Sequence, residues 1–241
     1  YLFLLFRKLM HEFITVFSRK LINSQFDLGI QFRVRATNET LDYVQKNMPN
    51  AIMFLSSEKF FEYLIPKTKK DGSFLEFGVW KGKSIKNISE LVGKRSSKIV
   101  HGFDSFEGLP EDWLGFNDVK GRFNLHGKLP DVPKNVKLHK GWFHEILPKF
   151  LVENDESVSF LHIDSDLYSS AKTVLNLLRE RIVVNTIIVF DDYFNYPNWQ
   201  KGEFKAFQEF VKENNIRYEY MGFTHGKATA VRVIQKNKNS G

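Results

Sequence analysis

Acidic residues and a glycine stand directly after the short apolar runs of this chain. Glu76 and Gly78 close one run, and Asp104 closes the next. A carboxylate at a strand end can receive a ligand ammonium group, and a glycine lets the backbone approach a nucleoside. Asp104 could then accept both hydroxyls of a ribose. An ammonium group and a ribose without a phosphate describe S-adenosylmethionine, although either carboxylate alone could equally be a helix cap.

Further aspartates follow the next two apolar runs. Asp164 and Asp166 follow one of them, and Asp191 and Asp192 follow the other. The ends of neighbouring parallel strands converge, and carboxylates that meet there repel one another. A hard divalent cation relieves this repulsion, and a ligand set of oxygens favours Mg²⁺, with Mn²⁺ or Ca²⁺ as alternatives. We therefore predict a metal site of Asp164, Asp191 and Asp192; the alternative is that Asp166 and Asp192 cap helices.

The family resemblance described below implies methyl transfer from a sulfonium group, which needs an apolar aromatic pocket and a strengthened nucleophile. A divalent ion lowers the pKa of a bound hydroxyl, and a nearby base removes its proton. Asp164 and His162 are the predicted catalytic residues for this role. The alternative for His162 is an ordinary buried histidine of a strand.

Two short motifs point to other functions. The Gly-Lys-Ser at 82–84 is similar to the end of a nucleotide phosphate-binding loop. That loop needs four residues between its first glycine and its Gly-Lys pair, whereas only residues 79–81 lie between Gly78 and Gly82. Tyr168 and Lys172 have the spacing of the acid–base pair of short-chain dehydrogenases, which also need a third glycine where this chain has Ser84. The alternative functions are a nucleotide-phosphate enzyme and a non-catalytic S-adenosylmethionine or sugar-binding module.

Alternating short apolar runs and amphipathic segments must position these residues. Strands are predicted at 73–79, 98–103, 136–139, 158–163 and 187–190, and helices at 168–178 and 203–211. This order predicts an α/β, Rossmann-like, doubly wound sheet that is mostly parallel. Two further strands, at 216–222 and 228–234, predict an antiparallel C-terminal hairpin, which makes seven strands in all.

The N-terminal part is predicted to be helical. Apolar residues recur at three- and four-residue spacing over 1–22, and a second helical stretch covers 52–65. The first of these helices needs a surface to cover. We expect it to dock on protein, either as a lid or in a homo-oligomer.

Composition limits the remaining classes. The 241 residues carry a net charge of +7, and 42% of them are hydrophobic, which excludes wholesale disorder. The lysines are scattered, so we expect no nucleic-acid partner, and no apolar run approaches the ~20 residues that span a bilayer. The absence of cysteine excludes disulfides and agrees with a cytoplasmic location.

Eight segments occur in the order typical of the macrocin O-methyltransferase (TylF/MycF-like) family, which the chain resembles over nearly its whole length. They are 74–82, 102–110, 120–123, 132–136, 141–143, 147–148, 162–168 and 190–193. The opening residues 1–8 also resemble that family's N-terminal helix.

The resemblance implies a class I methyltransferase fold with S-adenosylmethionine as donor and magnesium-dependent methylation of a small-molecule hydroxyl, on a sugar in known members. It implies a helical segment 1–70, a methyltransferase domain 71–235 and a polar tail 236–241. The chain departs from the family at 81–83 and at His144, which concerns the substrate. The implied cofactor-binding residues are Glu76, Gly78, Asp104, Ser105, Trp142 and Asp164, and the implied metal ligands are Asp164, Asp191 and Asp192.

Overall fold

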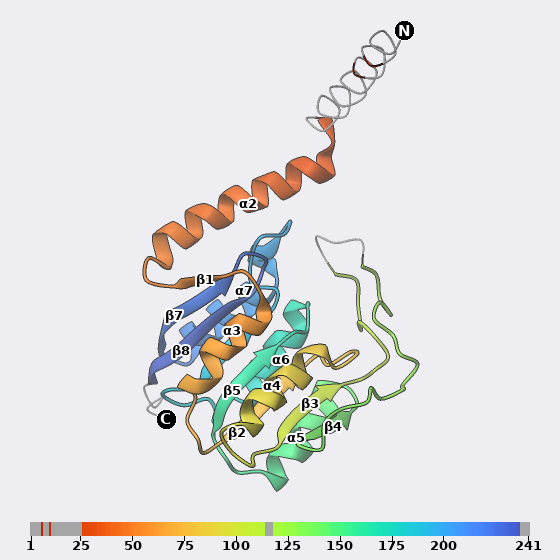
Figure 1. Cartoon of the computed structure of the whole chain (residues 1–241), viewed down its shortest axis with the longest axis vertical. Coiled ribbons are helices and arrows are strands. Elements are labelled where there is room, and N and C mark those ends of the chain that lie inside the picture. Colours follow the sequence, from red (N-terminus) through yellow and green to blue (C-terminus); the bar gives the residue numbers. More distant parts are fainter. Residues whose placement is uncertain (1–5, 7–9, 11–25, 114–117, 237–241) are drawn as a thin grey trace.

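Eight strands form one mixed sheet in the order β1-β7-β8-β6-β5-β2-β3-β4 (Figure 1). The computed structural model describes residues 6, 10, 26–113 and 118–236. The strands β2 to β6 are parallel to their neighbours among these five, whereas β8 is antiparallel to both β6 and β7. The strands are β1 (Ile52–Phe54), β2 (Ser73–Phe77), β3 (Val100–Asp104), β4 (Val136–Lys140), β5 (Val158–Ile163), β6 (Ile187–Phe190), β7 (Ile216–Thr224) and β8 (Thr229–Lys236).

The fold class is confirmed, but the predicted number of seven strands is wrong. The additional strand is β1, which lies within the segment predicted to be helical over 52–65 and pairs in parallel with residues 222–224 of β7. The helix that follows begins only at Ser57, where the Ser56 side chain caps the Lys59 amide. A three-residue edge strand is fixed by its distant partner, and apolar periodicity does not reveal such a strand.

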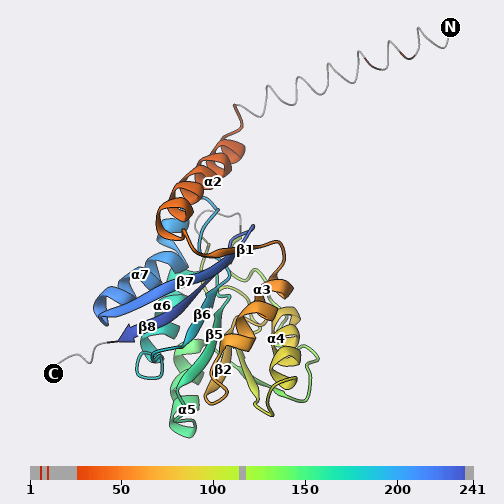
Figure 2. The same cartoon turned by 60° about the vertical axis from the view of Figure 1, so that its left-hand side comes forward.

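Helices cover both faces of the sheet, as a doubly wound fold requires (Figures 1 and 2). One core joins the sheet to α3 and α4, and the other joins it to α5, α6 and α7. The predicted helices at 168–178 and 203–211 are confirmed as α6 and α7. The helices are α2 (Leu28–Asn47), α3 (Ser57–Leu64), α4 (Lys83–Gly93), α5 (Phe143–Glu153), α6 (Tyr168–Leu177) and α7 (Glu203–Glu213), with short 3₁₀ turns η1 (Ile65–Lys67) and η2 (Trp199–Lys201).

The central strands are buried on both faces. Every residue of β2, β5 and β6 is buried, which matches the unbroken apolar character of strands packed between two helical layers. The register places Glu76 of β2 beside His162 of β5. Polar residues inside or directly after these strands are therefore held rigidly at known positions.

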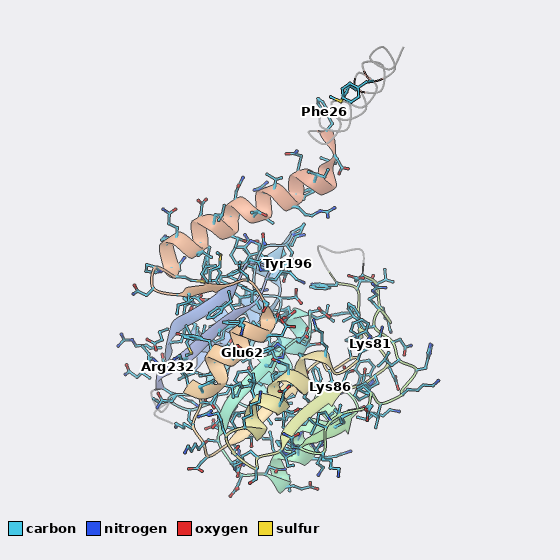
Figure 3. The ribbon with its side chains drawn as sticks, in the orientation of Figure 1. Phe26, Glu62, Lys81, Lys86, Tyr196 and Arg232 are labelled. Atoms are coloured by element: carbon cyan, nitrogen blue, oxygen red, sulfur yellow. The ribbon has the colours of Figure 1, made fainter. Side chains whose placement is uncertain are left out.

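The helix α2 is anchored to the domain through its C-terminal half. The Thr40 hydroxyl accepts a hydrogen bond from the Asn195 amide at 2.9 Å, and the Tyr43 and Tyr220 hydroxyls are 2.5 Å apart. Its other end projects away from the sheet, where Phe26 is 80% exposed (Figure 3). The predicted helix over 1–22, apart from residues 6 and 10, and the tail after residue 236 lie outside the described residues.

No helix in the described part of the chain combines the length and the apolar composition that crossing a membrane requires.

Candidate active site

A cavity of about 450 Å³ opens beyond the carboxyl ends of β2, β3 and β5. Ligands of open parallel sheets bind at this edge. Five of the six residues predicted to bind a cofactor line the cavity, and the sixth, Glu76, does not. The five are Gly78, Asp104, Ser105, Trp142 and Asp164.

Gly78 makes the sharp turn after β2 that brings the cavity walls together. Its φ angle is +91°, and a Cβ atom at this position would lie 1.7 Å from the carbonyl oxygen of Asp164. Its amide donates to the Phe103 carbonyl at 2.9 Å, which ties the turn to the end of β3. Only glycine combines this backbone conformation with this close approach.

The Asp104 carboxylate organises the same turn. One oxygen, Oδ2, accepts hydrogen bonds from the amides of Val79 at 2.8 Å and Trp80 at 2.7 Å. The other oxygen, Oδ1, accepts from the Phe106 amide at 2.7 Å. Sequence analysis predicted Asp104 as a ligand contact and missed this second task. An ionised carboxylate offers about four acceptor positions, so Oδ1 keeps room for a ligand hydroxyl.

The same contacts count against a phosphate-binding loop. Such a loop needs free backbone amides, and those of Val79 and Trp80 are directed to Asp104. The Lys83 ammonium lies 3.5 Å from the Glu58 carboxylate, and its side chain is 91% exposed. The Gly-Lys-Ser at 82–84 is the start of α4, and its resemblance to a nucleotide-binding loop is local.

Glu76 is fully buried beneath the turn. Its Oε1 accepts from the Ser84 hydroxyl at 2.9 Å, and its Oε2 lies 3.2 Å from His162 Nδ1. Burial raises the pKa of Glu76, while the hydrogen bond from His162 opposes the rise. Burial alone would lower the pKa of His162, but the hydrogen bond and charge of Glu76, with the charges of Asp191 and Asp192, more than offset this and the pKa is raised. The predicted contact of Glu76 with a ligand ammonium group stays a prediction.

A cluster of carboxylates surrounds the ends of β5 and β6. Burial, then the charge of Asp191 and the other neighbouring acids, raises the pKa of Asp164 well above its usual range. Burial and Asp192 do the same for Asp166 and for Glu203. Burial and mutual repulsion therefore disfavour negative charge on these carboxyl groups, and a cationic ligand would relieve the repulsion.

Asp164 lies at the centre of this cluster and belongs to two groups of ligand atoms. It gathers with His162 and Asp191 in one group and with Asp166 and Asp192 in the other, each group lying within 4.8 Å. The three predicted metal ligands are thus divided between two groups of the described residues. Asp192 also forms an ion pair with Lys227, which lies in the turn between β7 and β8.

Asp166 and Asp192 do not cap the helices that follow them. The N-cap of α6 is Leu167, and no side chain bonds to the amides there. Asp166 instead takes a φ angle of +62° and contacts Asp192. The N-cap of α7 is Gly202.

Glu203 is the residue that sequence analysis missed most clearly. It begins α7, is fully buried, and accepts hydrogen bonds from the backbone amides of Ser165 at 3.1 Å and Asp192 at 3.2 Å. It thereby joins the segments after β5 and β6. An acidic residue in the first turn of a helix is the available signal, but it is typical of ordinary helices too.

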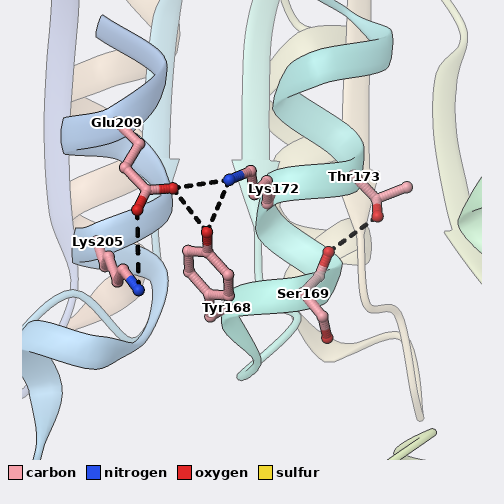
Figure 4. A network of polar contacts seen from close by, with 6 residues as sticks. All are labelled: Tyr168, Ser169, Lys172, Thr173, Lys205 and Glu209. Carbon is pink, nitrogen blue, oxygen red and sulfur yellow. Dashed lines mark hydrogen bonds and ion pairs between the residues drawn. The ribbon is translucent and has the colours of Figure 1, made fainter. Parts of the chain in front are cut away.

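The Tyr168–Lys172 pair lies away from the cavity, between α6 and α7. The Lys172 ammonium is 2.8 Å from both the Tyr168 hydroxyl and the Glu209 carboxylate, and Lys205 approaches the other Glu209 oxygen at 3.8 Å (Figure 4). Lys172 takes part in this network with its side chain still 37% exposed. Ser169, Ser170 and Thr173 are the residues of α6 that line the cavity.

Residues 75–193, which contain the glycine turn and the acidic cluster, match a family model described as "Methyltransferase domain". This match covers about half of the chain. Its described architecture is similar to the calicheamicin methyltransferase CalS11, with a TM-score of 0.58 and 21% identity over 84% of this chain and 91% of that one. It is also similar to the O-methyltransferase NovP, with a TM-score of 0.57 and 19% identity over 74% and 79% of the two chains.

A curated relative of the methyltransferase domain is demethyldecarbamoylnovobiocin O-methyltransferase from Streptomyces niveus. It is 25% identical over 147 residues, which are 52% of this chain and 54% of the relative. The chain therefore spans about half the length of this relative. The two solved structures agree with the observed fold.

Proposed function

We propose that the protein is an S-adenosylmethionine-dependent O-methyltransferase that acts on a hydroxyl of a small molecule. The observation that carries the proposal is the cavity at the strand ends of a methyltransferase domain, bounded by Gly78, Asp104 and Trp142. In its finer form, the proposal places the protein near the macrocin O-methyltransferase family and its acceptor among sugar-bearing compounds. The relative named for a novobiocin precursor supports this choice.

Each wall of the cavity has a proposed task. Asp104 would accept the ribose hydroxyls, Ser105 would lie beside them, and Trp142 would pack against the adenine ring. Gly78 would let the cofactor approach the backbone closely, because it has a φ angle of +91° and no Cβ atom. Glu76, which is buried beneath the turn, would receive the ammonium group of the cofactor with its carboxylate.

Asp164 is the proposed general base. It lines the cavity, whereas His162 is 1% exposed and directs Nδ1 at Glu76. The acidic surroundings of Asp164 would also suit a cofactor that carries a positive charge, such as a sulfonium. A divalent cation, when bound, would lower the pKa of the acceptor hydroxyl.

The residues present fit a divalent cation, since carboxylates of Asp164 and Asp191 converge beside an unpartnered imidazole nitrogen. The predicted set with Mg²⁺ also contains Asp192, which here pairs with Lys227. The set of Asp164, Asp191 and Asp192 therefore stays a prediction.

Calorimetry with S-adenosylmethionine, S-adenosylhomocysteine and ATP tests the first part of this proposal. We expect the two sulfur nucleosides to bind and ATP not to compete with them. Binding of ATP alone would support the nucleotide-phosphate alternative and contradict ours.

Transfer of a labelled methyl group to a panel of sugar-bearing and catechol-like hydroxyl compounds tests the second part. We expect methylation of at least one sugar-bearing acceptor. Cofactor binding without turnover on any acceptor would favour the non-catalytic binding module.

A further inference from the structure

His162 is a buried polar residue with one nitrogen left over. Its side chain is 1% exposed, and its Nδ1 lies 3.2 Å from Oε2 of Glu76. Its Nε2 is buried and has no hydrogen-bond partner among the residues that the structure describes. A buried polar atom without a partner costs stability, so a native protein that keeps one commonly uses it for a ligand.

The ring stands among carboxylates that could share such a ligand. One ring nitrogen of His162 and one oxygen each of Asp164 and Asp191 lie within 4.8 Å of one another. Because Nδ1 is occupied by Glu76, Nε2 is the nitrogen available to an ion. A carboxylate that holds the other ring nitrogen is the usual partner of a metal-binding histidine, since it fixes the tautomer and raises the basicity of the ligand.

The same three residues open onto a second cavity, of about 240 Å³, on the α3–α4 side of the turn. Ser84, Asn87 and Trp80 contribute to its wall. The cavity supplies an entry path and leaves coordination positions for water or a substrate oxygen. Asp164 lines both cavities and so joins this site to the proposed cofactor site.

Asp192 is held on the other side of Asp164. Its Oδ1 pairs with the Lys227 ammonium, whose side chain is 33% exposed. The backbone oxygen of Lys227 also accepts the amides of Tyr193 and Phe194, so the pairing residue is fixed to the same loop. An ammonium already engages Oδ1 of Asp192, and among the described residues it is His162 that gathers with both Asp164 and Asp191.

We propose that His162, Asp164 and Asp191 bind one divalent transition-metal ion, with Glu76 orienting the imidazole. One nitrogen and two oxygens suit ions that accept both donor types, such as Mn²⁺, Fe²⁺ or Zn²⁺, better than Mg²⁺, which prefers oxygen alone. The site differs from the predicted aspartate set in both its ligands and its metal. Its use in catalysis rests on the proposed function, whereas its occupancy does not.

Mn²⁺ titration of the chelator-treated full chain, followed by the electron paramagnetic resonance of the free ion, tests the site. We expect Mn²⁺ to bind with one-to-one stoichiometry and more tightly than Mg²⁺. Spin-echo modulation should show one directly bound nitrogen, which His162→Gln removes. We expect Glu76→Gln to weaken binding by roughly 10–100-fold, the usual cost of losing a residue that orients a ligand, and His162→Gln to weaken it further.

Asp191→Asn and Asp192→Asn form a matched pair of neighbours that separates the two ligand sets. We expect Asp191→Asn to abolish Mn²⁺ binding and Asp192→Asn to leave it unchanged within error. Loss of binding in Asp192→Asn with retention in His162→Gln would overturn the proposal in favour of the aspartate set. Circular dichroism and thermal unfolding establish that each variant is folded.

Failure of Mn²⁺ to bind the folded wild type would also overturn the proposal. A protonated His162 would then supply the positive charge beside the carboxylates. Calorimetry with S-adenosylmethionine separates this outcome from failure of the proposed function. Cofactor binding without metal binding contradicts only the metal site. Metal binding without cofactor binding contradicts only the proposed function.

Discussion

Asp104 and Asp164 stand at the ends of the two strands that flank β2, and both face the larger cavity, but their charges are balanced differently. Asp104 accepts three backbone amides at 2.7 to 2.8 Å. Asp164 lies among other carboxylates, and burial and their charges raise its pKa. The first carboxylate is satisfied by the fold, and the second is left for a ligand. Asp104 therefore shapes the site through its hydrogen bonds, whereas Asp164 is available to bind a cation.

Gly78 connects these two regions, and changing it should have the largest effect. Gly78→Ala places a methyl group against the Asp164 carbonyl oxygen at a φ of +91°. We expect a loss of at least about 3 kcal/mol in the free energy of unfolding, measured with urea.

Gly121→Ala is the matched control, because Gly121 has a φ of +81° and no atom of the described residues lies within 4 Å of its Cβ position. It should cost only the backbone strain, about 1 kcal/mol. Equal losses in the two variants would contradict the close approach that joins the two regions.

Asp104→Asn tests the satisfied carboxylate. The amide side chain keeps one acceptor oxygen and turns a donor toward backbone N–H groups, so the turn loses hydrogen bonds. We expect the free energy of unfolding and the free energy of S-adenosylmethionine binding each to fall by about 1–3 kcal/mol.

Calorimetry and urea unfolding measure these two losses. Asp112→Asn is the control, because Asp112 also accepts a backbone amide, from Lys120 at 2.8 Å, but at an exposed position. Unchanged cofactor affinity in a folded Asp104→Asn protein would remove Asp104 from the proposed binding site.

Asp164→Asn tests the unsatisfied carboxylate through pH. Its folded pKa is raised above the unfolded value of about 3.9, so its stabilising effect is complete below that value and is lost as pH rises through the folded pKa. In chelator, we expect the wild type to lose stability between acid and neutral pH and the variant to lose less.

Thermal unfolding across this pH range gives the two curves, and their difference is the measure. His101 and His139, 3.0 Å apart, act in the opposite direction in both proteins, because burial and neighbouring positive charge lower their pKa values to about 4. Parallel curves would show that Asp164 carries no uncompensated charge.

Lys172→Met should have the smallest effect, because the Tyr168–Lys172–Glu209 network belongs to neither region. We expect S-adenosylmethionine affinity and methyl transfer to stay unchanged within error. Calorimetry and the transfer assay measure both. A loss of turnover with intact cofactor binding would give the Tyr168 and Lys172 pair a catalytic part after all.

Much of the sheet could be predicted from the sequence, since its central strands are short and mostly apolar runs with turn residues after them. Residues that directly follow these runs, such as Gly78, Asp104 and Asp164, were therefore placed at the right edge of the sheet and line the cavity there. The strand β1 was missed, because its only pairing is with residues 222–224, far along the chain.

By itself, the sequence determined which residues stand at strand ends, because the apolar runs that form strands and the residues that end them are local properties of the chain. Only the tertiary structure decided which carboxylates are paired and which are not. Lys227 reaches Asp192 from the β7–β8 turn, and Glu203 reaches the same segment from α7. Such contacts depend on how distant segments pack. Charges interact strongly in a buried site, so a change in the partner of one carboxylate alters the pKa values of the others in the cluster.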